Sequence, residues 1–292
     1  MDTCSIAAGQ LFSIPDTLSG VMRQDALIIL GAGYMARFMP TLTAGRYTDV
    51  RFTSRIPDSN LTYVSPRQRL RFDLSQPDTW SQIPPGADML WCFPATPLDS
   101  VRQFAAHITG SFRRLVVLSS TSAYDVTKST DYPPPWIDEC APVDLRKPRV
   151  QGEEFLRKEY GAIVLRVAGI YGPNRNPIDW LRTRRVGPSR KYVNLIHVED
   201  LAAICLAALA RGYPGEIYNV SDGIPRRWDE IYMIARDRWH VPAIPEQSVQ
   251  EAGKRIETRK LRESLGESLR HADLFTSIDM LERSSATNVT EP

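Results

Sequence analysis

The sequence has no apolar segment approaching the roughly 20 residues needed to span a bilayer, so we expect no membrane partner. Its 36 Lys and Arg nearly balance 34 Asp and Glu, and the formal net charge is +2. This balance gives no electrostatic case for nucleic acid as a partner. Residues 1–24 lack a basic start and a long apolar core, which excludes a signal or transit peptide and predicts a loosely held N-terminal extension.

Cysteine and histidine are also scarce. The four cysteines lie far apart without a C-x-x-C pair, and the four histidines show no ligand spacing. The sequence therefore predicts no metal site and reduced thiols in a cytoplasmic protein. Its composition, 42% hydrophobic and 24% charged, is typical of a globular chain with one large α/β domain or two unequal lobes.

A glycine turn follows the first apolar run, Ala-Leu-Ile-Ile-Leu, which predicts a buried strand. Gly31-x-Gly33-x-x-Ala36 has the G-x-G-x-x-G/A form of a dinucleotide-binding turn. Gly31 permits the tight turn, Gly33 lets a pyrophosphate approach the backbone, and Ala36 lets the next helix pack closely. With Tyr34 and Met35 in the same turn, these residues are predicted to bind the cofactor. The alternative is an ordinary strand-to-helix turn.

Strand and helix patterns alternate through the first 170 residues. Strands are expected at 26–30, 50–55, 70–74, 88–93, 115–118 and 162–167, and helices at 34–42, 98–108 and 147–160. Nearly continuous apolar strands predict a parallel sheet covered on both faces. The fold class is therefore α/β, with a Rossmann-type doubly wound sheet forming an NAD(P)-binding domain over 25–170.

The pattern changes from residue 171 onward. Helices are expected at 178–185 and 198–210 and over most of 227–281, and a strand at 216–220 is expected to return to the sheet. Residues 171–283 are thus predicted to form a smaller, mostly helical substrate lobe, followed by a disordered tail at 284–292.

The end of the second expected strand indicates which dinucleotide binds. Thr53, Ser54 and Arg55 stand where an NAD-binding unit carries an acidic residue for the ribose hydroxyls. A carboxylate repels a 2′-phosphate, whereas Arg55 and Ser54 can bind one, so NADP is favoured over NAD. A solvated arginine is the alternative. Asp73 either accepts from the adenine amino group or serves as a turn residue.

The segment 115–124, Leu-Val-Val-Leu-Ser-Ser-Thr-Ser-Ala-Tyr, resembles the strand-end signature of extended short-chain dehydrogenases/reductases. That group includes NAD(P)-dependent sugar-nucleotide epimerases and dehydratases. Further similar blocks follow in the family's order at 136–139, 165–173, 194–202 and 218–223. Segments 253–256 and 260–266 are similar to the C-terminal lobe of atypical bacterial members.

The resemblance implies a catalytic serine or threonine at the end of the fifth strand, a role that falls on Ser120, with Thr121 next to it. Phe93 and Pro94, where the fourth expected strand ends, are further predicted cofactor contacts. Tyr171 begins a Tyr-Gly-Pro loop similar to the one that flanks the nicotinamide and substrate, and a plain Gly-Pro turn is the alternative.

The family's Tyr-x-x-x-Lys pair is where this sequence departs. Tyr124 and Lys128 match it literally, but in the loop after the fifth strand, where residues four apart do not share a face. Residues 145–153, which should carry the pair on the next helix, include no tyrosine. If Glu153 matches the family's glutamate, Arg149 replaces the lysine and Leu145 the tyrosine.

A one-residue shift instead places Arg146 at the tyrosine position. Arginine holds a ribose or an oxyanion well, but it is a poor proton donor because its pKa exceeds about 12. The standard proton relay is therefore absent, or Tyr124 has been recruited from the loop.

Arginines near the Tyr-Gly-Pro loop form the remaining candidate site. Asn174, Arg175, Arg182, Arg184 and Arg185 can line a pocket for an anionic substrate or form a solvated helix face.

The sequence thus predicts an NADP-dependent oxidoreductase or epimerase/dehydratase acting on a small or nucleotide-linked carbonyl or hydroxyl substrate. Ser120 positions the substrate oxygen, Arg149 holds the ribose or oxyanion, and Tyr124 is the acid/base candidate. The alternative is a catalytically inactive NAD(P)-binding regulator or scaffold. A homodimer is a further partner hypothesis.

Overall fold

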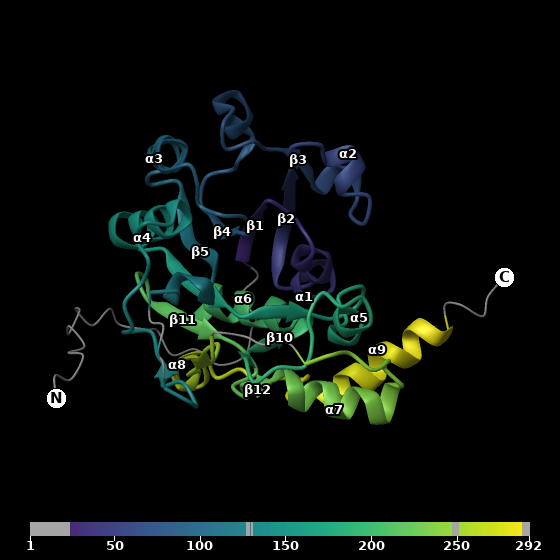
Figure 1. Ribbon diagram of the computed structural model, residues 1–292. Helices are drawn as coiled ribbons and strands as arrows, with labels where there is room; N and C mark the ends of the chain where they lie inside the picture. The colour runs from purple at the N-terminus through teal and green to yellow at the C-terminus, as the bar shows by residue number, and fades with distance from the viewer. Residues whose placement is uncertain (1–23, 127–128, 130, 247–250, 288–292) are drawn as a thin grey trace.

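The computed structural model describes residues 24–126, 129, 131–246 and 251–287 (Figure 1). Its centre is a seven-stranded sheet in the order β11-β7-β5-β4-β1-β2-β3, with every neighbouring pair parallel. The strands are β1 (Gln24–Leu30), β2 (Tyr47–Ser54), β3 (Arg69–Arg71), β4 (Ala87–Trp91), β5 (Phe112–Ser120), β7 (Ile163–Val167) and β11 (Ile217–Val220). This confirms the predicted α/β, doubly wound sheet.

Apolar strand sequences explain why the sheet lies inside the molecule. Ile29 of β1 pairs with Phe52 of β2 and Leu90 of β4, and all three side chains are fully buried. A parallel sheet is stable when helices cover both of its faces, because nearly every side chain of its central strands then leaves water.

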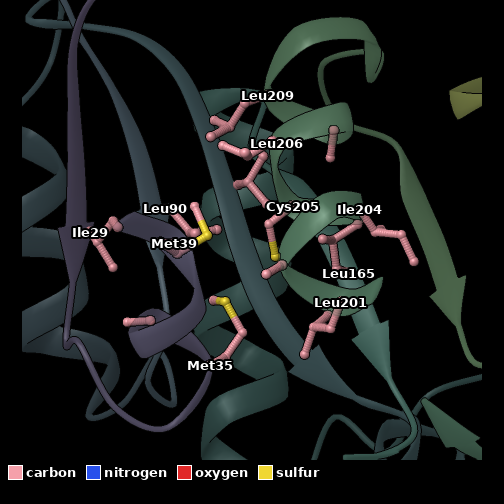
Figure 2. Packing of buried hydrophobic residues seen from close by; sticks show 14 of the residues in the cluster. Ile29, Met35, Met39, Leu90, Leu165, Leu201, Ile204, Cys205, Leu206 and Leu209 are labelled. Atoms are coloured by element: carbon pink, nitrogen blue, oxygen red, sulfur yellow. The ribbon is translucent and has the colours of Figure 1, made fainter. Parts of the chain in front are cut away.

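Helices cover the two faces. On one face, α3 (Leu98–His107) and α4 (Pro148–Tyr160) pack on the sheet. The other face is covered by a 3₁₀ turn, η1 (Met35–Phe38), by α1 (Met39–Thr43) and by α6 (Val198–Arg211). Figure 2 shows Met35 and Met39 beside the leucines and Cys205 of α6, in the same cluster as strand residues such as Ile29.

The first helix differs from the prediction of one continuous helix over 34–42. The chain forms the 3₁₀ turn η1 and then the five-residue helix α1. Pro40 stands in the first turn of α1, where proline is tolerated. Inside one continuous helix over 34–42 it would lack the N–H for the bond to the Ala36 carbonyl, and its ring would clash with that carbonyl. The glycine turn therefore leads into a short, broken helix.

A second hydrophobic core lies beyond the sheet. It is enclosed by α5 (Pro177–Arg182), α7 (Trp228–Trp239) and α9 (Leu274–Thr287), and Figure 1 shows α7 and α9 side by side. Residues of β8 (Gly169–Tyr171), β10 (Leu195–His197) and β9 (Tyr192–Val193) pack in this core; β8 pairs with β10, and β9 pairs with β12 (Arg226–Arg227). The pair of β6 (Trp136–Ile137) with β13 (Arg255–Ile256) packs in a separate cluster with Tyr124. Helix α8 (Arg259–Leu265) packs on α6 and β11.

Several expected boundaries were wrong. The helix expected over 178–185 ends at Arg182, because Arg184 has φ +55°, which no α-helix accommodates. The region 227–281 holds β12 and β13 as well as helices. Helix α9 continues to Thr287, within the tail expected to be disordered. The expected N-terminal extension, except Gln24, and residues 288–292 lie outside the described residues. In the described part of the chain, no helix has the length and apolarity required to cross a membrane.

Candidate active site

The glycine turn is tied to the end of β2. Gly31 has φ +73°, its N–H donates to Thr53 Oγ1 at 2.9 Å, and a Cβ on it would lie 2.4 Å from the Phe93 ring. Gly33 is exposed, and a Cβ there would meet nothing closer than the Gly31 carbonyl oxygen, at 3.9 Å. The space over Gly33 is therefore open to a phosphate group, and the turn fits a dinucleotide.

The other predicted residues of the turn point in different directions. The side chains of Met35 and Ala36 are 5% and 1% exposed and pack in the core with α6 (Figure 2 shows Met35). Their buried side chains leave only backbone N–H groups for a phosphate, and cofactor contacts from these two residues stay a prediction. Tyr34 is half-buried, and its hydroxyl donates to the Pro173 carbonyl oxygen at 2.7 Å.

At the end of β2, the Ser54 hydroxyl accepts from Asn60 Nδ2 at 2.9 Å, and Arg55 is exposed. Asp73 Oδ1 accepts from the N–H and the hydroxyl of Ser75, at 2.9 and 2.7 Å. These bonds hold the pKa of Asp73 below its ordinary value. The Asp73 carboxylate thus makes turn contacts, and its bond to the adenine amino group stays a prediction.

A cavity of about 200 Å³ lies at the carboxyl ends of β4, β5 and β7. Its lining residues come from the loop after β4, from β5, α4, β7 and β8: Cys92, Phe93, Pro94, Ala95, Leu118, Ser119, Arg149, Glu153, Val167 and Ile170. In doubly wound sheets, ligands bind outside the carboxyl ends of the strands. The structure brings three predicted residues to this cavity, namely Phe93, Pro94 and Arg149.

A chain of hydrogen bonds links Arg149 to the end of β5. Arg149 Nη2 donates to Ser122 Oγ, and the Ser122 N–H donates to Ser120 Oγ at 3.2 Å. Ser120 is the N-cap of the 3₁₀ turn η4 (Thr121–Tyr124), and neither it nor Thr121 lines the cavity. Of the two serines that end β5, Ser119 lines the cavity, and its Oγ is buried. Successive residues of a strand point to opposite faces, so Ser119 and Ser120 have different surroundings, and the catalytic role of Ser120 stays a prediction.

Glu153 is the buried acid of the cavity. It lies one turn after Arg149 on α4, it is 2% exposed, and its Oε1 is 3.8 Å from Arg166 Nε. Arg166 also donates to Glu154 Oε1 at 3.1 Å, so one buried guanidinium serves two carboxyl groups. Burial raises the pKa of Glu153, and the Ser119 hydroxyl and Arg166 offset this in part. The sequence marked Glu153 only as an alignment point.

Tyr124, the acid/base candidate from the loop, lies outside the cavity. Its side chain is fully buried, its hydroxyl donates to Asn219 Oδ1 at 2.7 Å, and the Arg166 guanidinium lies 4.8 Å from its ring centroid. Burial raises the pKa of Tyr124 to about 12. Lys128, the other half of the literal match, lies outside the described residues.

The tyrosine position of the family helix is not filled by a proton donor. Leu145 precedes α4 and is 56% exposed. Arg146 donates from Nε and Nη2 to the two carboxylate oxygens of Asp144, at 2.8 and 3.0 Å, and its side chain is 84% exposed. Neither residue lines the cavity, so the one-residue shift does not restore the missing relay.

Tyr171 also lies in a core rather than at the cavity. Its side chain is fully buried in the second core, its ring packs edge-on against His197 at 5.1 Å, and burial raises its pKa to about 12. The expected cofactor contact thus lacks an exposed ring, and the preceding Ile170 lines the cavity.

Three potential metal ligands meet at the start of α6, which the sequence did not predict. Ligand atoms of His197, Glu199 and His271 lie within 4.8 Å of one another. The two imidazoles are stacked, with centroids 3.5 Å apart, and His271 Nε2 lies 3.0 Å from Glu199 Oε2. The His197 Nδ1 accepts from the Glu199 N–H at 3.3 Å, and burial lowers the pKa of His197 to about 4. These contacts join the start of α6 to the segment before α9.

No family model matches the chain, and no curated protein sequence matches it. Solved structures do. A functionally unknown conserved protein from Silicibacter pomeroyi is 24% identical, with 89% of this chain and 99% of that chain covered and a TM-score of 0.69. A putative NAD-dependent epimerase/dehydratase from Methylobacillus flagellatus is 23% identical, with 90% and 99% covered and a TM-score of 0.72.

A short-chain dehydrogenase/reductase superfamily protein from Agrobacterium tumefaciens, solved with NAD, is 15% identical, with 91% and 98% covered and a TM-score of 0.72. Other similar structures were solved with UDP-glucuronic acid and NAD or with NADPH. The structural neighbours are thus epimerase/dehydratase and short-chain dehydrogenase/reductase proteins. The chain has their fold, as the sequence resemblance predicted.

Proposed function

We propose that the chain is an NADP-dependent oxidoreductase or epimerase of the atypical short-chain dehydrogenase/reductase type. The observation that carries this proposal is the cavity beside the glycine turn, where Ser119, Arg149 and Glu153 share one space of about 200 Å³. A cavity with a few converging polar groups at the carboxyl edge of a doubly wound sheet is typical of a catalytic site.

The cofactor would be held by the glycine turn and the end of β2. Gly33 leaves room for the pyrophosphate, and Arg55 with Ser54 would bind the 2′-phosphate, since β2 ends without a carboxylate. Bound there, the nicotinamide supplies or accepts a hydride at a substrate carbon. Phe93 and Pro94 would border it on the side of β4.

The proton of the reaction is assigned to Glu153. Burial favours the protonated form of Glu153 more than Arg166 and the Ser119 hydroxyl oppose it, so in the reductive direction Glu153 donates the proton that a carbonyl oxygen takes up. In the oxidative direction the carboxylate takes that proton back. Arg149 stabilises negative charge on the same oxygen, and the Ser119 hydroxyl orients it. The proposed substrates are small or nucleotide-linked carbonyl or hydroxyl compounds, which the UDP-glucuronic acid in a similar structure supports.

The test combines binding with turnover. NADPH and NADH are titrated against the protein, and NADPH oxidation is then followed with a panel of sugar-nucleotide and small carbonyl compounds. With an active substrate, Glu153→Gln should lower kcat at least about 100-fold while the Kd for NADPH stays within threefold. Glu159→Gln, at an exposed position of the same helix, is the matched control and should leave both values unchanged. Binding of neither nucleotide would refute the proposal.

A second candidate is a dinucleotide-binding regulator without turnover. The observation in its favour is that no tyrosine lies on the cavity side of α4, while Tyr124 is buried against Asn219. This candidate predicts tight NADPH binding, a large increase in thermal stability with ligand, and no NADPH oxidation with any compound of the panel.

A further inference from the structure

We propose that Arg175 is an anion-binding residue of the dinucleotide site, which pairs with the pyrophosphate at the glycine turn. This inference rests on the proposed function, because it assumes that a dinucleotide binds over Gly33. The glycine turn by itself offers a phosphate only backbone N–H groups and a short, broken helix. Arg175, which follows the Tyr-Gly-Pro loop far from the turn in sequence, would add a positive charge.

The first observation is the place of the guanidinium. Its carbon lies 4.3 Å from the centroid of the Tyr34 ring, and Tyr34 directly follows Gly33 in the turn. An arginine stacked on an aromatic face keeps its N–H donors in the plane of the group, where they remain available to a further acceptor. Arg175 therefore presents donors beside the side chain of the residue that directly follows Gly33.

The second observation is that the loop is fastened to the turn. The Tyr34 hydroxyl donates to the Pro173 carbonyl oxygen at 2.7 Å. A Cβ on Gly172 would lie 2.9 Å from that hydroxyl and 2.7 Å from Val198 Cγ1, so only glycine allows this approach. The Arg175 N–H then donates to the Gly172 carbonyl oxygen at 2.9 Å, which closes a tight turn and sets where the arginine leaves the loop.

The third observation concerns charge. Arg175 is exposed, and no carboxylate of the described residues forms an ion pair with it. Arg182, seven positions later, is instead paired with Asp179 and Glu282. A guanidinium that is positioned by an aromatic ring and a glycine turn, yet not neutralised by an acid, suits a phosphate ligand.

The chemical class of ligand follows from this position. Arg55 stands at the end of β2, where NADP and NAD differ, whereas Arg175 stands at the turn, where both carry the same pyrophosphate. Loss of Arg175 should therefore weaken both dinucleotides by a similar factor. Loss of Arg55 should weaken only NADPH.

The test measures Kd for NADPH and for NADH by calorimetry, at low and at high salt, with no turnover involved. Arg175→Ala should raise both Kd values about 10-fold at low salt and less at high salt, while Arg175→Lys, which keeps the charge, should raise them less than Arg175→Ala. Arg236→Ala, which removes an exposed arginine on α7, is the control and should change neither Kd.

Three results would overturn the inference. The first is that both Kd values of Arg175→Ala stay within twofold of those of the unmodified protein. The second is that Arg175→Ala weakens the binding of NADPH alone, which would place the contact at the 2′-phosphate. A third contrary result is a loss of binding that tracks a lower urea midpoint, because the arginine would then only hold the loop. If the unmodified protein binds neither nucleotide, the proposed function fails together with this inference; if it binds both and Arg175→Ala binds equally well, only the inference fails.

Discussion

Gly152 and Ala95 bring α4 against the loop after β4 with no room for a side chain between them. A Cβ on Gly152 would lie 1.9 Å from the Ala95 carbonyl oxygen. Gly152 stands next to Glu153, and Ala95 lines the cavity. This backbone contact therefore sets the distance between α4, which carries Arg149 and Glu153, and the loop after β4 that lines the cavity.

Gly152→Ala should destabilise the protein, although alanine favours helices by about 1 kcal/mol over glycine. Overpacking costs about 1–3 kcal/mol. No flexible side chain can move to relieve it here, because the added Cβ would clash with the backbone carbonyl of Ala95. Urea unfolding should show a lower midpoint, and the Kd for NADPH should rise as α4 shifts. Gln151→Ala, at the exposed neighbouring position, should show neither effect. A midpoint above that of the unmodified protein would contradict the close contact.

Arg55→Ala should raise the Kd for NADPH about 10-fold or more and leave the Kd for NADH unchanged. A hydrogen bond to a charged group contributes about 1.5–3 kcal/mol, and only NADPH carries the 2′-phosphate. Arg55→Asp should reverse the preference, since a carboxylate bonds ribose hydroxyls and repels phosphate. Arg236→Ala, on α7, is the control. An equal loss of both nucleotides would remove the proposed role of Arg55.

Tyr124→Phe should lower the free energy of unfolding by about 1–3 kcal/mol, because it leaves the buried Asn219 Oδ1 without its 2.7 Å bond. The kcat of NADPH oxidation should stay within threefold, since Tyr124 does not line the cavity. Steady-state kinetics and urea unfolding on the same preparation separate the two effects. A drop of 100-fold or more in kcat at unchanged stability would restore Tyr124 as the acid.

Stability should fall as the pH is lowered through the range of His197. Its pKa is about 4 in the folded protein and near the ordinary 6.5 in the unfolded chain, so the unfolded state binds the proton more readily. The contribution of His197 to the free energy of unfolding is fully present above pH 6.5 and decreases as the pH falls toward 4. It is about 2 kcal/mol smaller at pH 5 than at pH 7. The stacked His271 and the nearby Glu199 share this environment.

His197→Asn, which keeps an N-cap side chain at the start of α6, should flatten this dependence. The measurement is urea unfolding at pH 7 and pH 5, with His107→Asn at an exposed position as the control. An unchanged slope in His197→Asn would mean that other groups titrate in this range.

The sequence could predict those parts of the fold that depend on residues close together in the chain. The buried run of β1, the turn at Gly31 and Gly33, and the alternation of strands and helices are local patterns, and the sheet confirmed them. The break of the first helix at Pro40 was also local, and a stricter use of proline's missing N–H predicts it.

The candidate site was less predictable. Counting along β5 selects Ser120, and which of Ser119 and Ser120 lines the cavity depends on the face of the strand that the packing turns toward it. The sequence left open whether Tyr124 replaces the missing acid, and only the structure shows its hydroxyl bonded to Asn219, 95 positions later. Glu153 became a candidate acid only once its burial beside Arg166 was visible.

By itself, the sequence determined the strand that ends in a glycine turn and the absence of a carboxylate after β2, because both depend on neighbours in the chain. Only the tertiary structure decided which side chains share the cavity and which cation stands beside the turn. Tyr34 and Pro173, which hold Arg175 there, are 139 positions apart. Packing of the whole sheet and its helices, rather than any local pattern, brings such distant residues within hydrogen-bond distance.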